Sequence, residues 1–463
     1  MYNSKQIISS LLACAPLLIN AESENTSPNI IFILTDDHHK DALGYAGNPI
    51  IQTPAMDHLA RHGVYFQNAF VTSPICAASR ASMLTGLYER THGYTFGQGF
   101  LKTPYMDISY PVILRQNGYH TGFFGKFGVE YPHATSLFDE ADIYDRDNQM
   151  EDHRGYFYKT IDSDTVHLTR YTGYQAQEFI KNAPTNKPFC LSISFSAPHA
   201  HDPSPDQFYW QRKSDTIYQH VTIPDPHLHD DIYFDRLPRE VREGFNRTRW
   251  YWRFDTPEKY QQTVKGYYRM ITEIDDEIQD IMDVLQKKGI AKNTIIIITG
   301  DNGFFLGERQ LAGKWLMYDL SVQVPLIIYD PRYIPQIDVE DMVLNIDIPK
   351  TILALAGIDA PDIYQGGSLA PYLKGNKPTN IREKILLEHL WDFDPIPSSE
   401  AIRTPEWKYI RYRTIQTPEE LYNLTEDPLE RNNLANNPLY QHILKKLRNE
   451  CTRQGERFAA EKY

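Results

Sequence analysis

Continuous hydrophobic runs that end in polar residues recur along the chain and predict the strands of a buried sheet. Such runs are 29–34 and 294–298, and between them lies a further apolar strand, 192–197, in which serines alternate with Ile193, Phe195 and Ala197. In chain order, these three segments lead into Thr35-Asp36-Asp37, Pro198-His199 and Gly300-Asp301-Asn302-Gly303. Strands that are hydrophobic at every position are typical of parallel sheets covered on both faces. A further strand is expected at 326–329.

Segments with hydrophobic residues three and four positions apart predict helices between these strands. The longest begins at Thr256 and Pro257, carries isoleucines from Ile271 to Ile281 on one face, and ends before Gly289. Shorter helices are expected at 54–62, 79–84 and 347–356. A helix that leads into a parallel strand indicates the α/β class. After Gly366-Gly367 the composition changes, and 402–410 and 420–424 look like antiparallel strands, so a smaller α+β unit is expected over 367–463.

Composition limits the possible partners. The chain has 463 residues, of which 41% are hydrophobic and 23% are charged, an ordinary globular balance. Its formal net charge of −13 argues against nucleic-acid binding, which needs a basic surface. Any attraction for an anionic substrate must therefore be local.

The first 21 residues resemble a signal peptide. Lys5 precedes a hydrophobic run from Ile7 to Ile19, and cleavage is expected after Ala21. The run is too short to span a bilayer, and no later segment looks transmembrane, so we expect export to the periplasm or outside without stable membrane insertion. The alternative is a lipoprotein cleavage box at Leu11-Leu12-Ala13-Cys14. The remaining cysteines are too few for a disulfide framework.

Carboxylates at two predicted strand ends indicate a cation site. The ends of parallel strands meet at one edge of a sheet, where open α/β folds bind ligands. This edge would bring together Asp36, Asp37, Asp301 and Asn302. Each pair alone is more often a solvated turn. Together they offer anionic oxygen ligands, which suit Ca²⁺ or, less well, Mg²⁺.

The segment from Pro74 to Gly86 contains the most informative motif of the chain. It reads Pro-Ile-Cys-Ala-Ala-Ser-Arg-Ala-Ser-Met-Leu-Thr-Gly, with Arg80 four residues after Cys76. Cys76 alone could be a small buried hydrophobic residue. The whole segment, however, resembles the type I sulfatase signature, Cys-x-(Pro or Ala)-x-Arg followed by Leu-Thr-Gly. The resemblance implies that a maturation enzyme oxidises Cys76 to formylglycine (3-oxoalanine).

Four more segments extend this resemblance to about residue 434. Gly118 to Gly128 is similar to the family's Gly-Tyr-x-Thr-x-x-x-Gly-Lys-Trp-His-Leu-Gly, with Lys126 at the sulfate-binding lysine. Gly128 stands where the family has a histidine, so that hydrogen-bond partner of the formylglycine is unassigned. Pro198-His199 matches the family's Pro-His pair, and Lys314 its second sulfate-binding lysine. The segment 427–434 resembles the family's carboxy-terminal motif.

The resemblance implies a fold and a mechanism. The fold is an alkaline-phosphatase-like α/β/α sandwich over 28–366, with a smaller carboxy-terminal subdomain built on an antiparallel sheet. Hydrated formylglycine would attack sulfur, helped by a cation held by the four strand-end residues and residue 76. Arg80, Lys126 and Lys314 would stabilise the transferring group, and His199 would protonate the leaving alcohol.

The substrate class rests on a segment rich in arginine and aromatic residues. Six arginines lie between Arg236 and Arg253, among aromatic side chains. Such a segment could be a nucleic-acid patch, a subsite for sulfated sugars or a solvated helical surface with salt bridges. We expect a sulfated polysaccharide or its oligosaccharides, with His201, Arg247 and Arg249 contacting it. The rival interpretations are a phosphonate or phosphate monoester hydrolase of the same superfamily and a non-catalytic relative that binds sulfated glycans.

Overall fold

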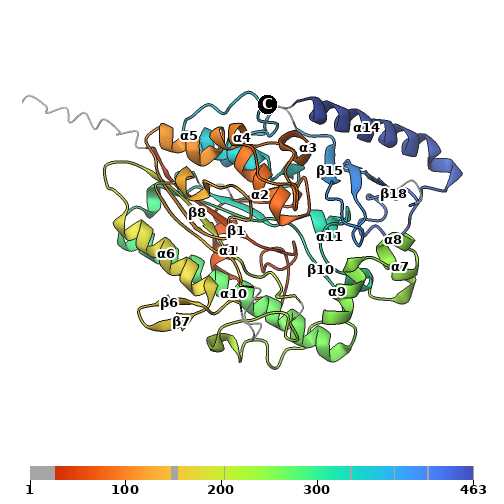
Figure 1. Ribbon diagram of the computed structural model, residues 1–463, viewed down its shortest axis with the longest axis horizontal. Coiled ribbons are helices and arrows are strands. Elements are labelled where there is room, and N and C mark those ends of the chain that lie inside the picture. The colour runs from red at the N-terminus through yellow and green to blue at the C-terminus, as the bar shows by residue number, and fades with distance from the viewer. Residues whose placement is uncertain are drawn as a thin grey trace, which may run out of the picture.

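A mixed eight-stranded sheet carries the fold of this computed structural model (Figure 1), which describes residues 27–147, 155–202, 204–333, 336–379, 381–413 and 417–461. The proposed signal peptide lies outside these residues. The strands are β1 (Asn29–Thr35), β2 (Val64–Phe66), β4 (His120–Gly125), β5 (Glu140–Ile143), β8 (Phe189–Ser194), β9 (Thr294–Gly300), β12 (Leu326–Tyr329) and β13 (Ile337–Val339). Their order is β13-β2-β12-β9-β1-β8-β4-β5. The five strands from β9 to β5 are parallel, whereas β12 runs antiparallel to both of its neighbours.

Helices cover both faces of the sheet, as the hydrophobic strands predicted. In β1, Ile30 and Phe32 belong to the core on one face and Ile31 and Ile33 to the core on the other. The first core includes α2 (Cys76–Thr85), α5 (Tyr110–Gln116) and α12 (Asp347–Leu355). The second includes α1 (Pro54–Arg61), α6 (Leu168–Asn182) and the long α10 (Pro257–Lys287). The expected α/β/α sandwich is confirmed.

Several expected boundaries differ from the structure, and the segment 402–410, expected as one strand, holds the end of β16 (Ser399–Arg403), a turn and the start of β17 (Trp407–Tyr412). Helix α2 begins at Cys76, three residues earlier than expected, because the Ser79 amide already donates to the Ile75 carbonyl, at 2.9 Å. The strand expected at 192–197 is β8, Phe189–Ser194. After it the chain turns, and the His199 amide donates to the Ser196 carbonyl, at 3.2 Å.

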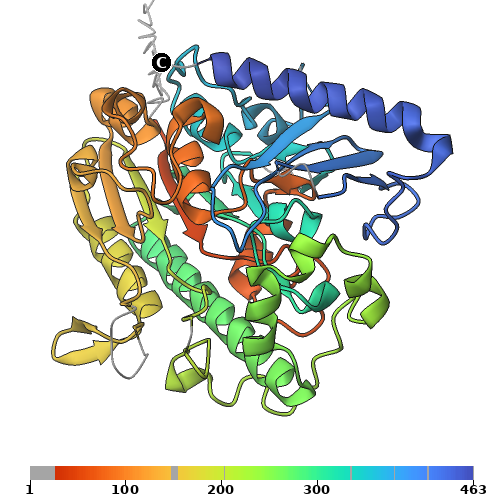
Figure 2. The ribbon, with the colours of Figure 1, turned by 45° about the vertical axis from the view of Figure 1, so that its right-hand side comes forward.

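A four-stranded antiparallel sheet forms the expected carboxy-terminal unit. Its strands lie in the order β15 (Ile385–His389), β16 (Ser399–Arg403), β17 (Trp407–Tyr412) and β18 (Glu420–Asn423). Helix α14 (Gln441–Ala460) packs along this sheet, as Figure 2 shows. Its Phe458 stacks on Tyr88 of the main domain, with ring centroids 4.1 Å apart. The hydrophobic side chains of both regions form one cluster, so the boundary at residue 366 stays a prediction.

None of the helices in the described ranges has the length and hydrophobicity that crossing a membrane requires. The described cysteines, Cys76, Cys190 and Cys451, are buried and free. The fold places the carboxyl ends of β1, β4, β8 and β9 at one edge of the sheet, and the amino end of α2 lies beside them.

Candidate active site

Four oxygen-bearing side chains meet where β1 and β9 end. The two strands pair in parallel, with Thr35 opposite Gly300, so the residues that follow them lie side by side. Asp36, Asp37, Asp301 and Asn302 are all fully buried. The Asp37 amide donates to Asp301 Oδ1 at 3.1 Å, and Asn302 Nδ2 donates to Asp37 Oδ1 at 2.6 Å. Asp37 has a φ of 65°, a conformation that costs energy in a residue other than glycine and is common at functional sites.

Cys76 occupies the first position of α2 and is 4% exposed. An extended residue, Ile75, precedes it, so the free amides of the first helical turn lie close to Cys76. Arg80 lies one turn further along the helix. Its Nε donates to Asp301 Oδ2 at 2.8 Å, and its Nη1 donates to the Lys126 carbonyl at 2.6 Å. Because Cys76 and Arg80 belong to the same helix, the bond from Arg80 to Asp301 fixes the position of Cys76 relative to the carboxylates at the sheet edge.

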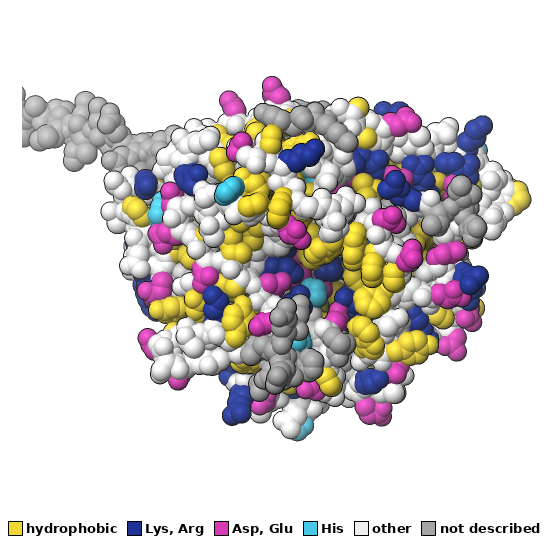
Figure 3. Space-filling view, viewed as in Figure 1, with side chains coloured by type: hydrophobic (Ala, Val, Ile, Leu, Met, Phe, Trp, Pro, Cys, Tyr) yellow, Lys and Arg dark blue, Asp and Glu magenta, His cyan; other side chains and the backbone are white. Residues whose placement is uncertain are grey.

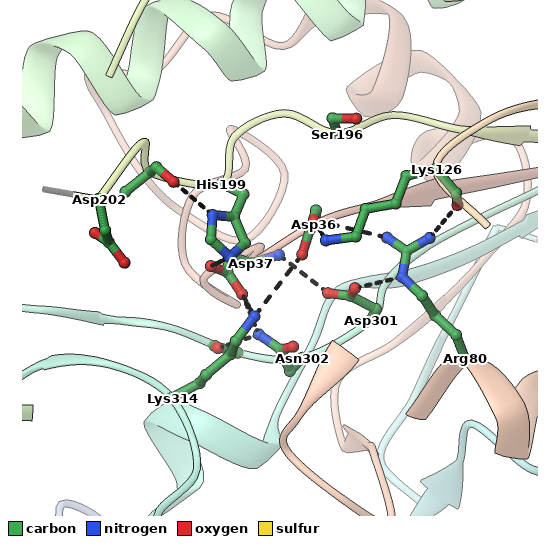
Figure 4. A network of polar contacts seen from close by, with 12 residues as sticks. Asp36, Asp37, Arg80, Lys126, Ser196, His199, Asp202, Asp301, Asn302 and Lys314 are labelled. Atoms are coloured by element: carbon green, nitrogen blue, oxygen red, sulfur yellow. Dashed lines mark hydrogen bonds and ion pairs between the residues drawn. The ribbon is translucent and has the colours of Figure 1, made fainter. Parts of the chain in front are cut away.

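Two buried lysines approach the carboxylates from opposite sides (Figure 4). Lys126, just after β4, pairs with Asp36 and lies 3.5 Å from Asp145 Oδ2. Lys314 Nζ lies 2.5 Å from Asp37 Oδ1. Burial would lower the pKa of each ammonium group, but the neighbouring carboxylates outweigh it and raise both. Both lysines therefore carry a positive charge.

The carboxylates keep acceptor atoms that no described residue satisfies. Asp36 Oδ1, Asp37 Oδ2 and Asn302 Oδ1 are buried and have no hydrogen-bond partner within the described parts of the chain. Ligand atoms of Asp36, Cys76 and Asp301 lie within 4.8 Å of one another, as do those of Asp36, Asp37 and His199. Buried acceptors without partners are costly. A hard divalent cation would satisfy them, so the donor set fits the expected metal.

Electrostatics divide the carboxylates into two kinds. Burial and the charge of Asp36 raise the pKa of Asp301 to about 7, although Arg80 opposes them. Burial also acts on Asp36, but the positive charges of Lys126, Lys314 and Arg80 outweigh it and hold its pKa well below the usual range. The lysines thus stabilise the ionised form of Asp36, whereas the nearby negative charge of Asp36 favours a proton or a cation at Asp301.

His199 follows β8 at the same edge. Its Nδ1 donates to the Ala200 carbonyl at 2.6 Å, and its Nε2 lies 3.5 Å from Asp37 Oδ2. Burial and the positive charge of Arg146 hold the pKa of His199 well below its ordinary value. The imidazole is therefore neutral near pH 7, although the negative charge of Asp36 acts in the opposite direction.

Cys76, Lys126, His199 and Lys314 all line one cavity of about 760 Å³. Aromatic side chains from distant parts of the chain line the rest of it. Figure 3 shows a hollow of this mixed character near the centre of one face, where lysine or arginine, acidic and histidine side chains meet beside a band of hydrophobic ones. The cavity connects the buried charges with solvent.

Of the three residues expected to contact substrate, one lines the cavity and two do not. Arg249 lines the cavity, although it pairs with Asp202, and its guanidinium lies 4.4 Å from the centre of the Trp315 ring. Arg247 is not among the described residues that line the cavity. It stacks 4.0 Å from the Trp250 ring and donates to Gln310. The other expected contact, His201, is 1% exposed and also lies off the cavity lining.

The absence of the family's histidine at Gly128 has a steric basis. Gly128 has a φ of 70°, and a Cβ atom there would lie 2.6 Å from Arg80 Cδ. A side chain would therefore have to displace the guanidinium that binds Asp301. The observed position of the Arg80 side chain therefore requires a residue without a side chain at position 128.

Sequence reasoning missed several residues of the cavity wall. Asp145 and Arg146 follow β5, which pairs in parallel with β4, so they reach the same sheet edge as the predicted site. The strand-end rule would have found them had this short, half-buried strand been recognised. Trp391 and Phe393 come from the carboxy-terminal unit, and no local signal linked them to Cys76.

Comparison with known proteins identifies the family of this chain. Residues 28–358 match the Sulfatase family, and residues 307–457 match the family described as N-sulphoglucosamine sulphohydrolase, C-terminal. An N-acetylglucosamine-6-O-sulfatase of Bacteroides thetaiotaomicron is 29% identical, over 95% of this chain and 87% of that protein. An ulvan-active sulfatase of Formosa agariphila is 26% identical, over 98% of this chain and 87% of that protein.

Solved structures show the same fold. A protein in complex with D-glucosamine-2-N,6-O-disulfate superimposes with a TM-score of 0.77 at 26% identity, covering 94% of this chain and 98% of that one. The phosphonate monoester hydrolase of Agrobacterium radiobacter also reaches a TM-score of 0.77, at 20% identity, which shows the shared fold alone. The family match covers most of the chain, and this protein therefore belongs to the sulfatase family and is a sulfuric ester hydrolase.

Proposed function

We propose that this protein hydrolyses sulfate esters on a sulfated polysaccharide or its oligosaccharides, with Cys76 matured to formylglycine and a divalent cation bound beside it. The observation that carries the proposal is the cavity in which Cys76, Lys126, Lys314 and His199 lie together above unpartnered carboxylate oxygens. Relatives named for N-acetylglucosamine-6-O-sulfate and for ulvan support a carbohydrate substrate.

The proposed modification gives residue 76 chemistry that cysteine lacks. A maturation enzyme would use an external two-electron oxidant, such as molecular oxygen, to convert the Cβ of Cys76 to an aldehyde, with the carbonyl oxygen replacing sulfur that leaves as sulfide. Its hydrate offers one hydroxyl to attack the sulfate ester and a second whose loss of a proton expels sulfate and restores the aldehyde. An unmodified cysteine or a serine would remain sulfated, because it has no second hydroxyl.

Asp36, Asp37, Asp301 and Asn302, with the matured residue 76, would hold the cation. We favour Ca²⁺ over Mg²⁺, because several protein oxygens converge and Ca²⁺ accepts six to eight ligands in flexible geometry. When bound, such a cation makes a hydroxyl beside it more acidic and neutralises charge on sulfate oxygens.

The remaining groups fall into clear roles in this proposal. Lys126 and Lys314 are held charged on two sides of the reacting centre, where they would bind sulfate oxygens. Arg80 Nη2 has no hydrogen-bond partner in the described structure. It could therefore donate a hydrogen bond to the matured residue 76 while the other nitrogens of Arg80 keep their present partners. His199 would transfer a proton to the leaving oxygen, because an anionic sulfate beside the imidazole raises its affinity for a proton.

Matched substrates test the function. The chain, produced together with a formylglycine-generating enzyme, should hydrolyse 4-nitrophenyl sulfate much faster than 4-nitrophenyl phosphate. Peptide mass spectrometry of the Cys76 segment should show the aldehyde. A preference for the phosphate would favour the phosphomonoesterase alternative, and an unmodified, inactive protein would favour a non-catalytic relative.

We also propose that the protein is exported, to the periplasm or outside the cell, with residues 1–21 removed as a signal peptide. The mature chain would consist of a catalytic domain, 28–366, and a carboxy-terminal subdomain, 367–463. Amino-terminal sequencing of the exported protein tests the cleavage after Ala21. Of the expected substrate contacts, we retain Arg249, which lines the cavity.

A further inference from the structure

An aromatic wall borders the cavity on the side of the carboxy-terminal unit. Trp391 and Phe393 stack with ring centroids 4.6 Å apart and planes 5° apart. Phe245 contacts Phe393 edge to face, at 6.5 Å, and stacks near Trp315, at 6.0 Å. Phe393 is 37% exposed, and all four rings line the cavity. The wall therefore presents hydrophobic ring surface to whatever lies above Cys76.

A polar pair borders the same cavity beside Lys126. Asp145 Oδ2 lies 3.5 Å from Lys126 Nζ, and the Asp145 side chain is 37% exposed. Arg146 is 7% exposed in its side chain and donates from Nη1 to the Ala200 carbonyl at 2.8 Å. Its Nε has no hydrogen-bond partner among the described residues, although it lies 3.5 Å from Asp145 Oδ1. The pair thus offers a carboxylate acceptor and a guanidinium donor where the sulfate pocket ends.

Both arginines that line this space have a carboxylate partner. Arg146 is paired with Asp145, and Arg249 is paired with Asp202. A second sulfate group would have to compete with these carboxylates for the guanidinium groups. Neutral hydroxyl groups can instead donate to Asp145 and accept from Arg146 without separating either pair.

We propose that this space is the subsite for the leaving group and that it accepts one pyranose ring carrying no second sulfate. One hydrophobic face of the ring would lie against Trp391 and Phe393, and its hydroxyl groups would bond to Asp145 and Arg146. A sugar ring has both a hydrophobic face and hydroxyl groups, whereas a simple aryl ring could contact the aromatic wall but could not hydrogen-bond to Asp145 and Arg146. The inference rests on the proposed sulfatase function and specifies its substrate.

Two substrates and two variants test the subsite. kcat/KM is measured for the best-cleaved methyl glycoside among a set of monosulfated hexoses and for 4-nitrophenyl sulfate. Asp145→Ala should lower kcat/KM at least tenfold on the sugar and less than threefold on the aryl sulfate. Trp391→Ala should lower it at least fivefold on both, because both substrates carry a ring. Asp145→Asn should recover part of the sugar activity, since its side chain still accepts hydrogen bonds.

Matched controls exclude general damage. Asp142→Asn changes a carboxylate of β5 that bonds to Tyr171 and Gln175, away from the cavity. Trp407→Ala changes a half-buried tryptophan of the carboxy-terminal sheet that packs on Tyr440. Both controls should keep kcat/KM within twofold on both substrates, and thermal melting checks that every variant is folded.

The results separate this inference from the proposed function. Equal losses on both substrates in Asp145→Ala would overturn it, because Asp145 would then act only through Lys126. Unchanged activity in Trp391→Ala would also overturn it. A wild-type protein that cleaves 4-nitrophenyl sulfate but no monosulfated hexose would overturn the sugar subsite and leave the sulfatase function intact. Failure on every sulfate ester would count against the proposed function itself.

Discussion

At the scale of single residues, the site is a set of buried charges that hold one another in place. Arg80 binds Asp301, Lys126 pairs with Asp36, and Lys314 pairs with Asp37. Each ion would be costly to bury alone, so removing one leaves its partner uncompensated. The same arrangement keeps Cys76 at the start of α2 and next to the carboxylates. Substitutions here should therefore affect both activity and stability.

Replacing Cys76 by serine should abolish turnover. Serine keeps the size and burial of the residue, but it cannot be matured by loss of sulfur from cysteine, and its hydroxyl has no second oxygen to release sulfate. We expect kcat to fall by about a thousandfold or more, in line with the loss of other covalent nucleophiles. Full activity in Cys76→Ser would contradict the formylglycine mechanism.

Introducing the histidine that the family carries at position 128 should reduce activity. The φ of 70° and the 2.6 Å approach to Arg80 mean that any side chain strains the backbone and moves the guanidinium. Overpacking of this kind costs about 1–3 kcal/mol of the free energy of unfolding. Gly128→His should therefore melt earlier and lose at least tenfold in kcat/KM on 4-nitrophenyl sulfate. Gly128→Ala measures the steric part alone, and a histidine variant more active than the wild type would refute this account.

At the scale of elements, parallel strands that end together explain why much of the site could be predicted. Because β1 and β9 each contain an uninterrupted hydrophobic run, their ends were visible in the sequence, and Asp36, Asp37, Asp301 and Asn302 followed from them. β5 escaped notice, since its residues are only half-buried or exposed, and Asp145 was missed with it. The predicted role of Arg247 in substrate binding did not rest on a strand end. It rested on a cluster of arginines in the sequence, and such a cluster does not determine which way each side chain of a helix points.

A buried ion network joins the carboxy-terminal sheet to the catalytic domain. Lys408 of β17 is fully buried, and its Nζ lies 2.5 Å from both Asp319 Oδ1 and Glu430 Oε1. Asp319 begins α11 (Asp319–Val322), which shortly follows Lys314 in the chain. The network therefore couples the antiparallel sheet to the segment that carries Lys314, the second lysine proposed to bind sulfate.

Lys408→Ala should destabilise the protein strongly. Two carboxylates would be left buried without their shared cation, although Arg403 still contacts Asp319, and breaking a buried pair costs about 3–5 kcal/mol. Urea denaturation measures the loss. Arg239→Ala breaks an exposed pair with Glu243 and should cost less than about 1 kcal/mol. Similar stabilities for the two variants would show that the Lys408 network is not a structural link.

At the scale of the whole molecule, an acidic protein must concentrate positive charge at its site. The formal net charge is −13, yet two buried and charged lysines, Lys126 and Lys314, line one cavity with Cys76. At 0.1 M salt the wider negative charge is screened beyond about 10 Å, so these groups dominate the potential that a bound sulfate meets. Composition predicted that the attraction must be local, but only the fold could show which cations are local.

Removal of divalent cations should lower the melting temperature as well as the activity. The buried acceptors of Asp36, Asp37 and Asn302 lack partners, and the pKa of Asp301 is raised to about 7 by burial and by Asp36, so the cation-free site is strained. A ligand that binds only the folded state stabilises it by about 2.7 kcal/mol at one hundred times its Kd. After exhaustive chelation the protein should melt several degrees earlier, and Ca²⁺ should restore both melting temperature and turnover better than Mg²⁺. Asp301→Asn is the control, because its melting temperature should respond much less to Ca²⁺. If chelation changed neither quantity in the wild type, the assignment of these four residues to a cation would be wrong.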